Sequence, residues 1–142
     1  MEYTIIWPIE PRPINRKKLS TSQYLLERIT VVKEYIDQAY TKPFVLRELA
    51  AKAYMSKYSL VRCFKEAYNT TPHRYFISKR MTYAKHLLSL GYQIKQIAEL
   101  CGYPDIYSFS KQYKMSFGIA PRFEQKDLPR NSSILKNYKT YP

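Results

Sequence analysis

Apolar residues in the middle of the chain recur with the spacing of a short amphipathic helix, and this spacing occurs twice. The first copy has apolar residues at positions i, i+3, i+4 and i+7, namely Leu46, Leu49, Ala50 and Ala53. Forty-eight residues later the same places hold Ile94, Ile97, Ala98 and Cys101. Such a spacing puts all four side chains on one helical face. Each copy therefore begins with a short helix that buries one stripe.

A second match follows in each copy, now at an offset of forty-nine residues. The matching pairs are Tyr58 and Tyr107, Ser59 and Ser108, Leu60 and Phe109, Arg62 and Lys111, Phe64 and Tyr113, Lys65 and Lys114, Asn69 and Gly118, and Pro72 and Pro121. The change of offset indicates one extra residue in the turn between the two helices of the second copy. The chain thus contains an internal repeat of helix, turn and helix.

The second helix of each copy has two faces of different character. At 100° per residue, the predicted inward side chains are Leu60, Phe64 and Ala67 in the first copy and Phe109, Tyr113 and Ser116 in the second. The predicted outward ones are Tyr58, Val61, Arg62 and Lys65, and then Tyr107, Ser110, Lys111 and Lys114. Ser56 and Asp105 are suitable N-caps for these helices. A helix-turn-helix whose second helix is basic outside has the geometry that enters a DNA major groove.

Capping and stop signals predict the remaining helices. Ser20 and Gln23 form a capping box for a helix to Tyr40, whose buried face is Leu25, Ile29, Val32, Ile36 and Ala39. The first helix of the first copy is expected at residues 46–54, with its turn at Met55. Thr71 caps and Pro72 begins a long helix to Leu90, which Gly91 ends. The apolar stripe of this long helix is Phe76, Ile77, Met81, Ala84, Leu87 and Leu88.

These elements predict an all-α, homeodomain-like fold of about seven helices, with two helix-turn-helix units joined by a long central helix. The expected DNA-binding domain is 20–126, with the first unit at about 20–71, the linker helix at about 72–90 and the second unit at about 92–126. Residues 1–19 are expected to be an arm or linker, whose Tyr3, Ile5 and Trp7 alternate like a short strand. The first interpretation is a loosely packed extended arm, and the alternatives are a linker or strand left from an upstream domain or an arm that contacts DNA. Residues 127–142 are expected to be a polar tail.

The length of the central helix bears on how DNA would be bound. Nineteen residues at about 1.5 Å each span roughly 28 Å. Successive major grooves on one side of a duplex recur about every 34 Å. One polypeptide can therefore be expected to occupy a two-part site without forming a dimer, and such a site need not be palindromic.

The charge of the chain favours a polyanionic partner. The formal net charge is +13, and residues 43–126 hold fourteen basic and five acidic side chains. No apolar run is long enough to cross a membrane and no cleavable signal is present, so the expected location is the cytoplasm. Two cysteines and two histidines without ligand spacing predict no metal site, no disulfide and no cofactor. Cys63 and Cys101 are expected to be core thiols.

With these motifs in place, the chain resembles the DNA-binding domain of the AraC/XylS family of bacterial transcription regulators over roughly residues 40–125. The matching residues are Leu49, Ala50, Ser56, Leu60, Arg62, Phe64, Lys65, Thr71, Pro72, Tyr75, Arg80, Met81, Ala84, Leu87, Leu88, Ile97, Ala98, Gly102, Tyr103, Asp105, Phe109, Ser110, Lys111, Tyr113, Lys114, Gly118 and Pro121.

Three places depart from the family pattern. Asn69 replaces the usual glycine, although asparagine also accepts a left-handed turn. The order Tyr107 then Ser108 reverses the usual order at the start of the second recognition helix. Ala120 replaces a capping serine, and Glu124 lies where an aromatic residue is expected, so the last helix is expected to be short or frayed.

The resemblance implies a sequence-specific transcription regulator, an activator, acting in the bacterial cytoplasm on the nucleoid. Its partners would be double-stranded promoter DNA and RNA polymerase. Family members commonly carry a separate ligand-sensing or dimerising domain. Only about forty residues precede the first helix-turn-helix, so no such domain and no small-molecule effector site is expected in this chain. It would be a domain-only regulator or the DNA-binding piece of a longer protein.

The candidate DNA contacts fall into two groups. The base-contact candidates are Tyr58, Val61, Arg62, Tyr107, Ser108, Ser110 and Lys111. Arg62 comes first, because a guanidinium can bond guanine through two hydrogen bonds and discriminate by about 1–3 kcal/mol; a phosphate contact or a surface salt bridge is the other interpretation. The phosphate-contact candidates are Lys57, Lys65, Thr71, His73, Arg74 and Lys114.

Two other functions compete with this one. An architectural protein that bends DNA would also be basic and helical, but it has no need of two shape-matched recognition helices. A DNA-repair methyltransferase would need a reactive, exposed cysteine, whereas both cysteines fall within the repeat. His73 and His86 have no nucleophile or carboxylate at useful spacing, so the chain is not expected to be an enzyme.

Overall fold

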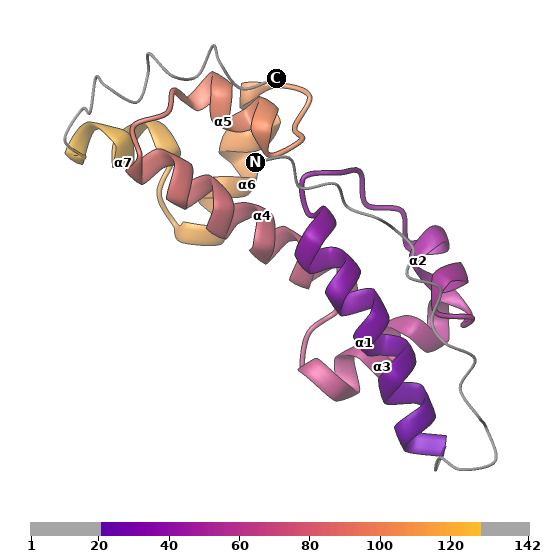
Figure 1. Cartoon of the computed structure of the whole chain (residues 1–142). Coiled ribbons are helices and arrows are strands. Elements are labelled where there is room, and N and C mark those ends of the chain that lie inside the picture. Colours follow the sequence, from indigo (N-terminus) through magenta and orange to yellow (C-terminus); the bar gives the residue numbers. More distant parts are fainter. Residues whose placement is uncertain (1–20, 129–142) are drawn as a thin grey trace. The chain divides into compact units, whose positions relative to one another are not determined.

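The computed structural model describes residues 21–128, and within that range the chain forms helices and no strand (Figure 1). The helices are α1 Thr21–Ala39, α2 Leu46–Lys52, α3 Lys57–Tyr68, α4 Pro72–Ser89, α5 Ile94–Leu100, α6 Ile106–Phe117 and α7 Pro121–Asp127. The expected all-α fold of about seven helices is confirmed. The expected arm at 1–19, the cap at Ser20 and the tail beyond residue 128 lie outside the described residues.

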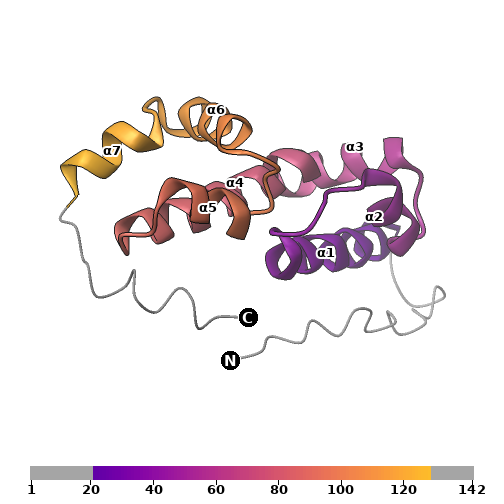
Figure 2. The same cartoon turned by 90° about the horizontal axis from the view of Figure 1, so that it is seen from above.

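The chain divides into two units, and the division falls inside α4, between Ile77 and Ser78. The first unit contains α1, α2, α3 and the start of α4, and the second contains the rest of α4 with α5, α6 and α7 (Figure 2). The bounds of α2 and α5 differ by 48 residues and those of α3 and α6 by 49. The second turn is therefore one residue longer than the first, as the repeat predicted.

The structure extends the repeat upstream to the helix that precedes each helix-turn-helix. At an offset of 48 residues, Ile36 and Ala39 of α1 match Ala84 and Leu87 of α4, and all four are buried. Each unit is thus a bracing helix followed by a helix-turn-helix. The sequence pattern did not show this relationship, because the paired side chains differ in size and the buried Val32 is matched by the buried Arg80.

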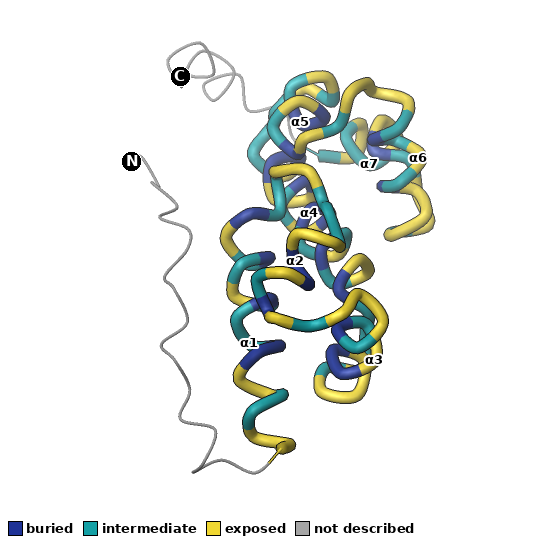
Figure 3. The backbone as a smooth tube through the Cα atoms, turned by 90° about the vertical axis from the view of Figure 1, so that its right-hand side faces the viewer, coloured by how far each residue is buried: buried dark blue, intermediate teal, exposed yellow. Residues whose placement is uncertain are grey.

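The core of the first unit is formed where α1, α2, α3 and the first turns of α4 meet. Its buried members are Ile29, Val32, Ile36, Leu49, Ala50, Ala53, Leu60, Cys63, Phe64 and Phe76. Figure 3 shows buried stretches along these helices with exposed stretches on the opposite faces. The Phe64 ring lies 4.8 Å from the ring of Tyr68 and 5.9 Å from that of Tyr75, centroid to centroid. Phe64 therefore joins α3 to the first turn of α4.

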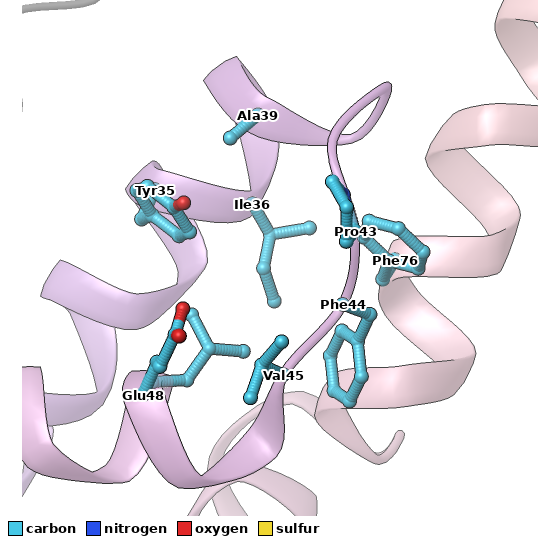
Figure 4. A pocket seen from close by; sticks show the side chains of 9 residues that line it. Tyr35, Ile36, Ala39, Pro43, Phe44, Val45, Glu48 and Phe76 are labelled. Carbon is cyan, nitrogen blue, oxygen red and sulfur yellow. The ribbon is translucent and has the colours of Figure 1, made fainter. Parts of the chain in front are cut away.

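A small hollow remains where the loop before α2 crosses α1. It is lined by Tyr35, Ile36, Ala39, Pro43, Phe44, Val45, Glu48, Leu49 and Phe76 (Figure 4). Its volume is about 10 Å³, which is about the space that one water occupies. This hollow is a packing gap and not a ligand site.

Two inward assignments were wrong, namely Ala67 and Ser116, which are exposed. Both lie in the last turn of a recognition helix, where the following aromatic residue takes the core position. The Tyr68 ring packs on Phe64, and the Phe117 ring packs on Tyr113 at 4.7 Å. The helical wheel gives the direction of a side chain, but the aromatic neighbour decides which position is covered.

The first helix of the repeat ends at Lys52 rather than at Tyr54, because Tyr54 has a φ of 53°. This left-handed conformation cannot continue a helix. Tyr54 occupies the place of Gly102, whose φ is 84°, in the second unit. The Tyr54 ring covers the guanidinium of Arg28, 4.7 Å away, and Tyr24 lies 5.1 Å from the same group. Arg28 is consequently only 7% exposed, which its sequence position did not predict.

In the second unit, α7 is held by polar contacts. Glu124 accepts a hydrogen bond from the Tyr113 hydroxyl and forms an ion pair with Lys85, with 3.3 Å between nitrogen and oxygen. Gln125 Nε2 donates to the carbonyl oxygen of Tyr92 at 2.8 Å. The last helix is short, as expected from the uncapped Ala120. Glu124, which departs from the family pattern, thus anchors the helix through charge instead of through an aromatic ring.

The equivalent contact in the first unit has the opposite arrangement of charge. At offsets of 48 and 49 residues, Lys85 and Glu124 match Asp37 and Tyr75. The Tyr75 hydroxyl donates to Asp37, so here the bracing helix provides the carboxylate. In both units the helix that follows the recognition helix contacts the bracing helix at the same place. The carboxylate belongs to the bracing helix in the first unit and to α7 in the second.

Both cysteines are buried and free, as expected for core thiols. The Sγ of Cys101 lies 3.9 Å from the carbonyl oxygen of Arg80. Burial raises the pKa of the Cys101 thiol from 9.0 to about 12. A thiol that stays protonated at neutral pH is a poor nucleophile.

The second unit should lose stability at alkaline pH. Burial raises the pKa of Cys101 from 9.0 to about 12, and it also raises the pKa values of Tyr103 and Tyr113 above 10.0. Each group is neutral when protonated, and the unfolded chain ionises first, so stability present below pH 9 is lost as the pH rises toward 12. Thermal unfolding followed by circular dichroism at about pH 8 and about pH 11 measures the change. The variant Cys101→Ala should show a weaker dependence on pH; an unchanged dependence would assign the effect elsewhere.

Gly118 should be sensitive to substitution for a backbone reason alone. Its φ is 76°, and a Cβ at this position would meet nothing within 4 Å. We expect Gly118→Ala to lower the free energy of unfolding by about 1 kcal/mol, because an alanine is strained in the left-handed region. Gly118→Asn should lose less, since Asn69 occupies the same conformation in the first unit with a φ of 55°. Urea unfolding of the three proteins tests this order, and equal losses for alanine and asparagine would contradict it.

Candidate nucleic-acid interface

The two recognition helices, α3 and α6, begin at side-chain caps, as predicted. The Ser56 Oγ accepts from the backbone N–H of Ser59 at 3.0 Å, and an Asp105 carboxylate oxygen accepts from that of Ser108 at 2.6 Å. The hydrogen bonds from Ser108 lower the pKa of Asp105, and its carboxylate, like that of an ordinary aspartate, is charged at neutral pH. The first recognition helix therefore begins with a neutral cap, and the second begins with a negative charge that disfavours a phosphate beside it.

The predicted outward face of α3 is largely exposed. Tyr58 is 75% exposed, Lys57, Arg62 and Lys65 are also exposed, and Val61 is half-buried beside them. The guanidinium carbon of Arg62 lies 5.8 Å from the centroid of the Tyr58 ring. The structure thus brings Tyr58 and Arg62 together on one surface.

The outward face of α6 has side chains at the same positions as that of α3, but several of them are of a different chemical type. Tyr107 is 76% exposed, Lys111 and Lys114 are exposed, and Ser108 and Ser110 are half-buried. Ile106 and Met115 are exposed apolar side chains on this helix that were not among the candidates. The second face is therefore basic and aromatic but contains no arginine.

The start of α4 presents the third group of candidates. Thr71 Oγ1 accepts from the backbone N–H of Arg74 at 3.2 Å, which confirms the predicted cap. His73 and Arg74 are exposed, and Thr71 is half-buried. The His73 ring contacts the ring of Phe44 edge-on, with 5.1 Å between centroids. The imidazole is held in place by this contact while the Arg74 side chain faces solvent.

One candidate that the sequence-based assignment missed is Arg122 at the start of α7. At an offset of 49 residues it matches His73, and continuing the repeat one residue past Pro121 would have identified it. Arg122 is exposed, and its guanidinium carbon lies 4.7 Å from the centroid of the Phe123 ring. Phe123 is itself 48% exposed. The second unit therefore has a cation at the place where the first has His73.

Two other kinds of feature, a metal site and a membrane-spanning helix, can be assessed for the described residues. No three histidine, cysteine, aspartate or glutamate side chains between residues 21 and 128 gather closely enough to hold a metal ion. Over the same range, no helix has the length and the apolar character that crossing a membrane requires.

Comparison with known proteins agrees with this arrangement. Residues 49–126 match the family model described as a helix-turn-helix domain. The chain is 30% identical over 111 residues to the probable transcriptional regulator LumQ of Photobacterium leiognathi, a match that covers 76% of this chain and 45% of that protein. The chain spans less than half the length of this curated relative.

Solved structures give the same result. A transcriptional regulator from Chromobacterium violaceum, described as containing an AraC-type DNA-binding domain, is 27% identical with a TM-score of 0.63, covering 71% of this chain and 91% of that one. The DNA-binding domain of AdpA in complex with a target DNA is 23% identical with a TM-score of 0.65, covering 70% and 91%, and shows the shared fold. The capped helix-turn-helix pair and these matches define the class: the chain belongs to the AraC family of helix-turn-helix proteins.

Proposed function

We propose that the chain is a sequence-specific DNA-binding transcription regulator that acts as an activator. The observation that carries this proposal is the pair of recognition helices, each begun by a side-chain cap and each with an exposed aromatic and basic face. A net charge of +13 supports a polyanionic partner. AdpA, which shares the fold, was solved with its target DNA.

We propose that α3 and α6 enter successive major grooves of one duplex. The 18 residues of α4 form one helix, which is about 27 Å long at about 1.5 Å per residue. Grooves on one face of a duplex recur about every 34 Å, and bending of the DNA at a cost of about 1–6 kcal/mol can offset the difference. The preferred site would then have two blocks and need no palindromic symmetry.

The proposed contacts follow the exposed faces. Base contacts are assigned to Tyr58, Val61, Arg62, Tyr107, Ser108, Ser110 and Lys111, and phosphate contacts to Lys57, Lys65, Thr71, His73, Arg74 and Lys114. Arg122 is added to the phosphate group because of its place in the repeat. The further partner would be RNA polymerase, and the location would be the bacterial cytoplasm at the nucleoid. No catalytic role is proposed, since both thiols are buried.

The test is selection of bound sequences from a random DNA pool, followed by titration of the selected duplex and a scrambled duplex at several salt concentrations. We expect two blocks about ten base pairs apart, and about thousandfold tighter binding of the selected duplex. One block would mean that the second unit holds only the DNA backbone. Equal affinities that fall steeply with salt would reject the proposal in favour of the architectural function.

A further inference from the structure

We propose that Tyr58, in addition to its own assigned base contact, positions Arg62 for the guanine contact assigned to that arginine, and that the second unit lacks such a pair. This inference rests on the proposed function, and it adds which residue positions Arg62 for the guanine contact. It starts from a contact on the outward face of α3, between the Tyr58 ring and the Arg62 guanidinium.

The geometry suits a positioning role for Tyr58. The two residues are four apart, so they are neighbours on the helix surface. Tyr58 is 75% exposed, so its ring is available to the guanidinium and contributes little to the core of the unit.

The chemistry of this pair favours guanine over the other bases. A guanidinium is attracted to a nearby aromatic ring and can keep its N–H groups free for a base. Two of these parallel donors match the O6 and N7 acceptors that guanine presents in the major groove. Holding the side chain before binding reduces the conformational freedom that is lost when the hydrogen bonds form.

The second unit has the same four-residue spacing between an aromatic ring and a cation but lacks the contact between them in the described part of the chain. Tyr107 and Lys111 occupy the places of Tyr58 and Arg62, and both are exposed. Within the described helices the Lys111 ammonium makes no contact with the Tyr107 ring. An ammonium is a compact point charge without the planar fork of arginine. We therefore expect the second block of the DNA site to have no guanine requirement of this kind.

The first experiment measures binding of the full chain to its selected duplex and to duplexes in which single guanines of the first block are replaced by 7-deazaguanine, which lacks the N7 acceptor. The parent protein should lose about tenfold or more at one position. Tyr58→Ala should reduce this ratio to less than about threefold with an unchanged slope of affinity against salt, whereas Tyr58→Phe, which retains the ring, should keep it. A ratio in Tyr58→Ala equal to that of the parent would overturn the inference.

The second experiment places an arginine four residues after the tyrosine in the second unit. Selection with Lys111→Arg should yield a new guanine in the second block, and Lys111→Arg combined with Tyr107→Ala should not. A second block that is unchanged by Lys111→Arg would overturn the inference that a ring and a guanidinium together specify guanine. Because these residues are exposed, circular dichroism should show all variants to be folded.

The inference and the proposed function fail in distinguishable ways. If the parent protein selects no sequence at all, the proposed function is wrong and the inference falls with it. If the parent selects a clear motif but Tyr58→Ala keeps full discrimination against 7-deazaguanine, only the role of Tyr58 is wrong.

Discussion

Replacing Phe64 with alanine should lower the free energy of unfolding of the first unit by about 3–5 kcal/mol. Phe64 has no exposed surface, and its ring contacts those of Tyr68 and Tyr75. The substitution removes both ring contacts and leaves a cavity at the centre of the cluster. Small domains are stable by only about 5–15 kcal/mol. The first unit of the variant should therefore be largely unfolded at the temperature at which that of the parent protein is half unfolded.

Thermal and urea unfolding followed by circular dichroism measure this loss. Tyr58→Ala is the matched control, because it removes a ring from an exposed position of the same helix and should change stability by about 0.5 kcal/mol or less. Tyr113 is the equivalent of Phe64 in the second unit, and Tyr113→Ala should instead destabilise that unit. A loss below about 1 kcal/mol in Phe64→Ala would mean that the core does not depend on this ring.

Replacing Arg62 with alanine should remove most of the sequence preference of the first unit. We expect the affinity for the selected duplex to fall by about 10- to 100-fold, corresponding to the 1–3 kcal/mol of a bidentate guanine contact, while the affinity for a scrambled duplex changes little. Fluorescence anisotropy with both duplexes at several salt concentrations measures the two losses. Arg62 is exposed, so the unit should remain folded.

Lys65→Ala is the control for Arg62→Ala. Lys65 lies further along α3 and is exposed, and its proposed partner is a phosphate. Its loss should weaken binding to both duplexes alike and reduce the slope of log affinity against log salt by about 1. Equal losses on the two duplexes in Arg62→Ala would reassign Arg62 to the phosphate group.

Most helices could be predicted from the sequence because their signals are local. The four-residue apolar pattern of α2 and α5, the caps at Ser56, Thr71 and Asp105, and the left-handed stop at Asn69 each depend on a few neighbouring residues. The repeat added strength to these signals, since a pattern that occurs twice at a constant offset is seldom accidental. For the candidate site, the same helical period placed Tyr58 and Arg62 on one outward face.

Other features could not be predicted, because they depend on residues far apart in the chain. The sequence left Glu124 as a departure from the family pattern, and only the packing of α7 brought it to Tyr113 and Lys85. The contact between Tyr58 and Arg62 depends on rotamers, about which the helical period contains no information.

The sequence by itself determined the class of fold, the position of the helix-turn-helix turns and the outward basic faces, because helical periodicity and capping depend on residues within about one turn of each other. The tertiary structure alone decided which side chains are covered. Arg28 is buried because the rings of Tyr24 and Tyr54 close over it, and Ala67 and Ser116 are exposed because Tyr68 and Phe117 take the core positions. Burial depends on which neighbours meet in space, and that is determined only when all the helices of a unit pack together.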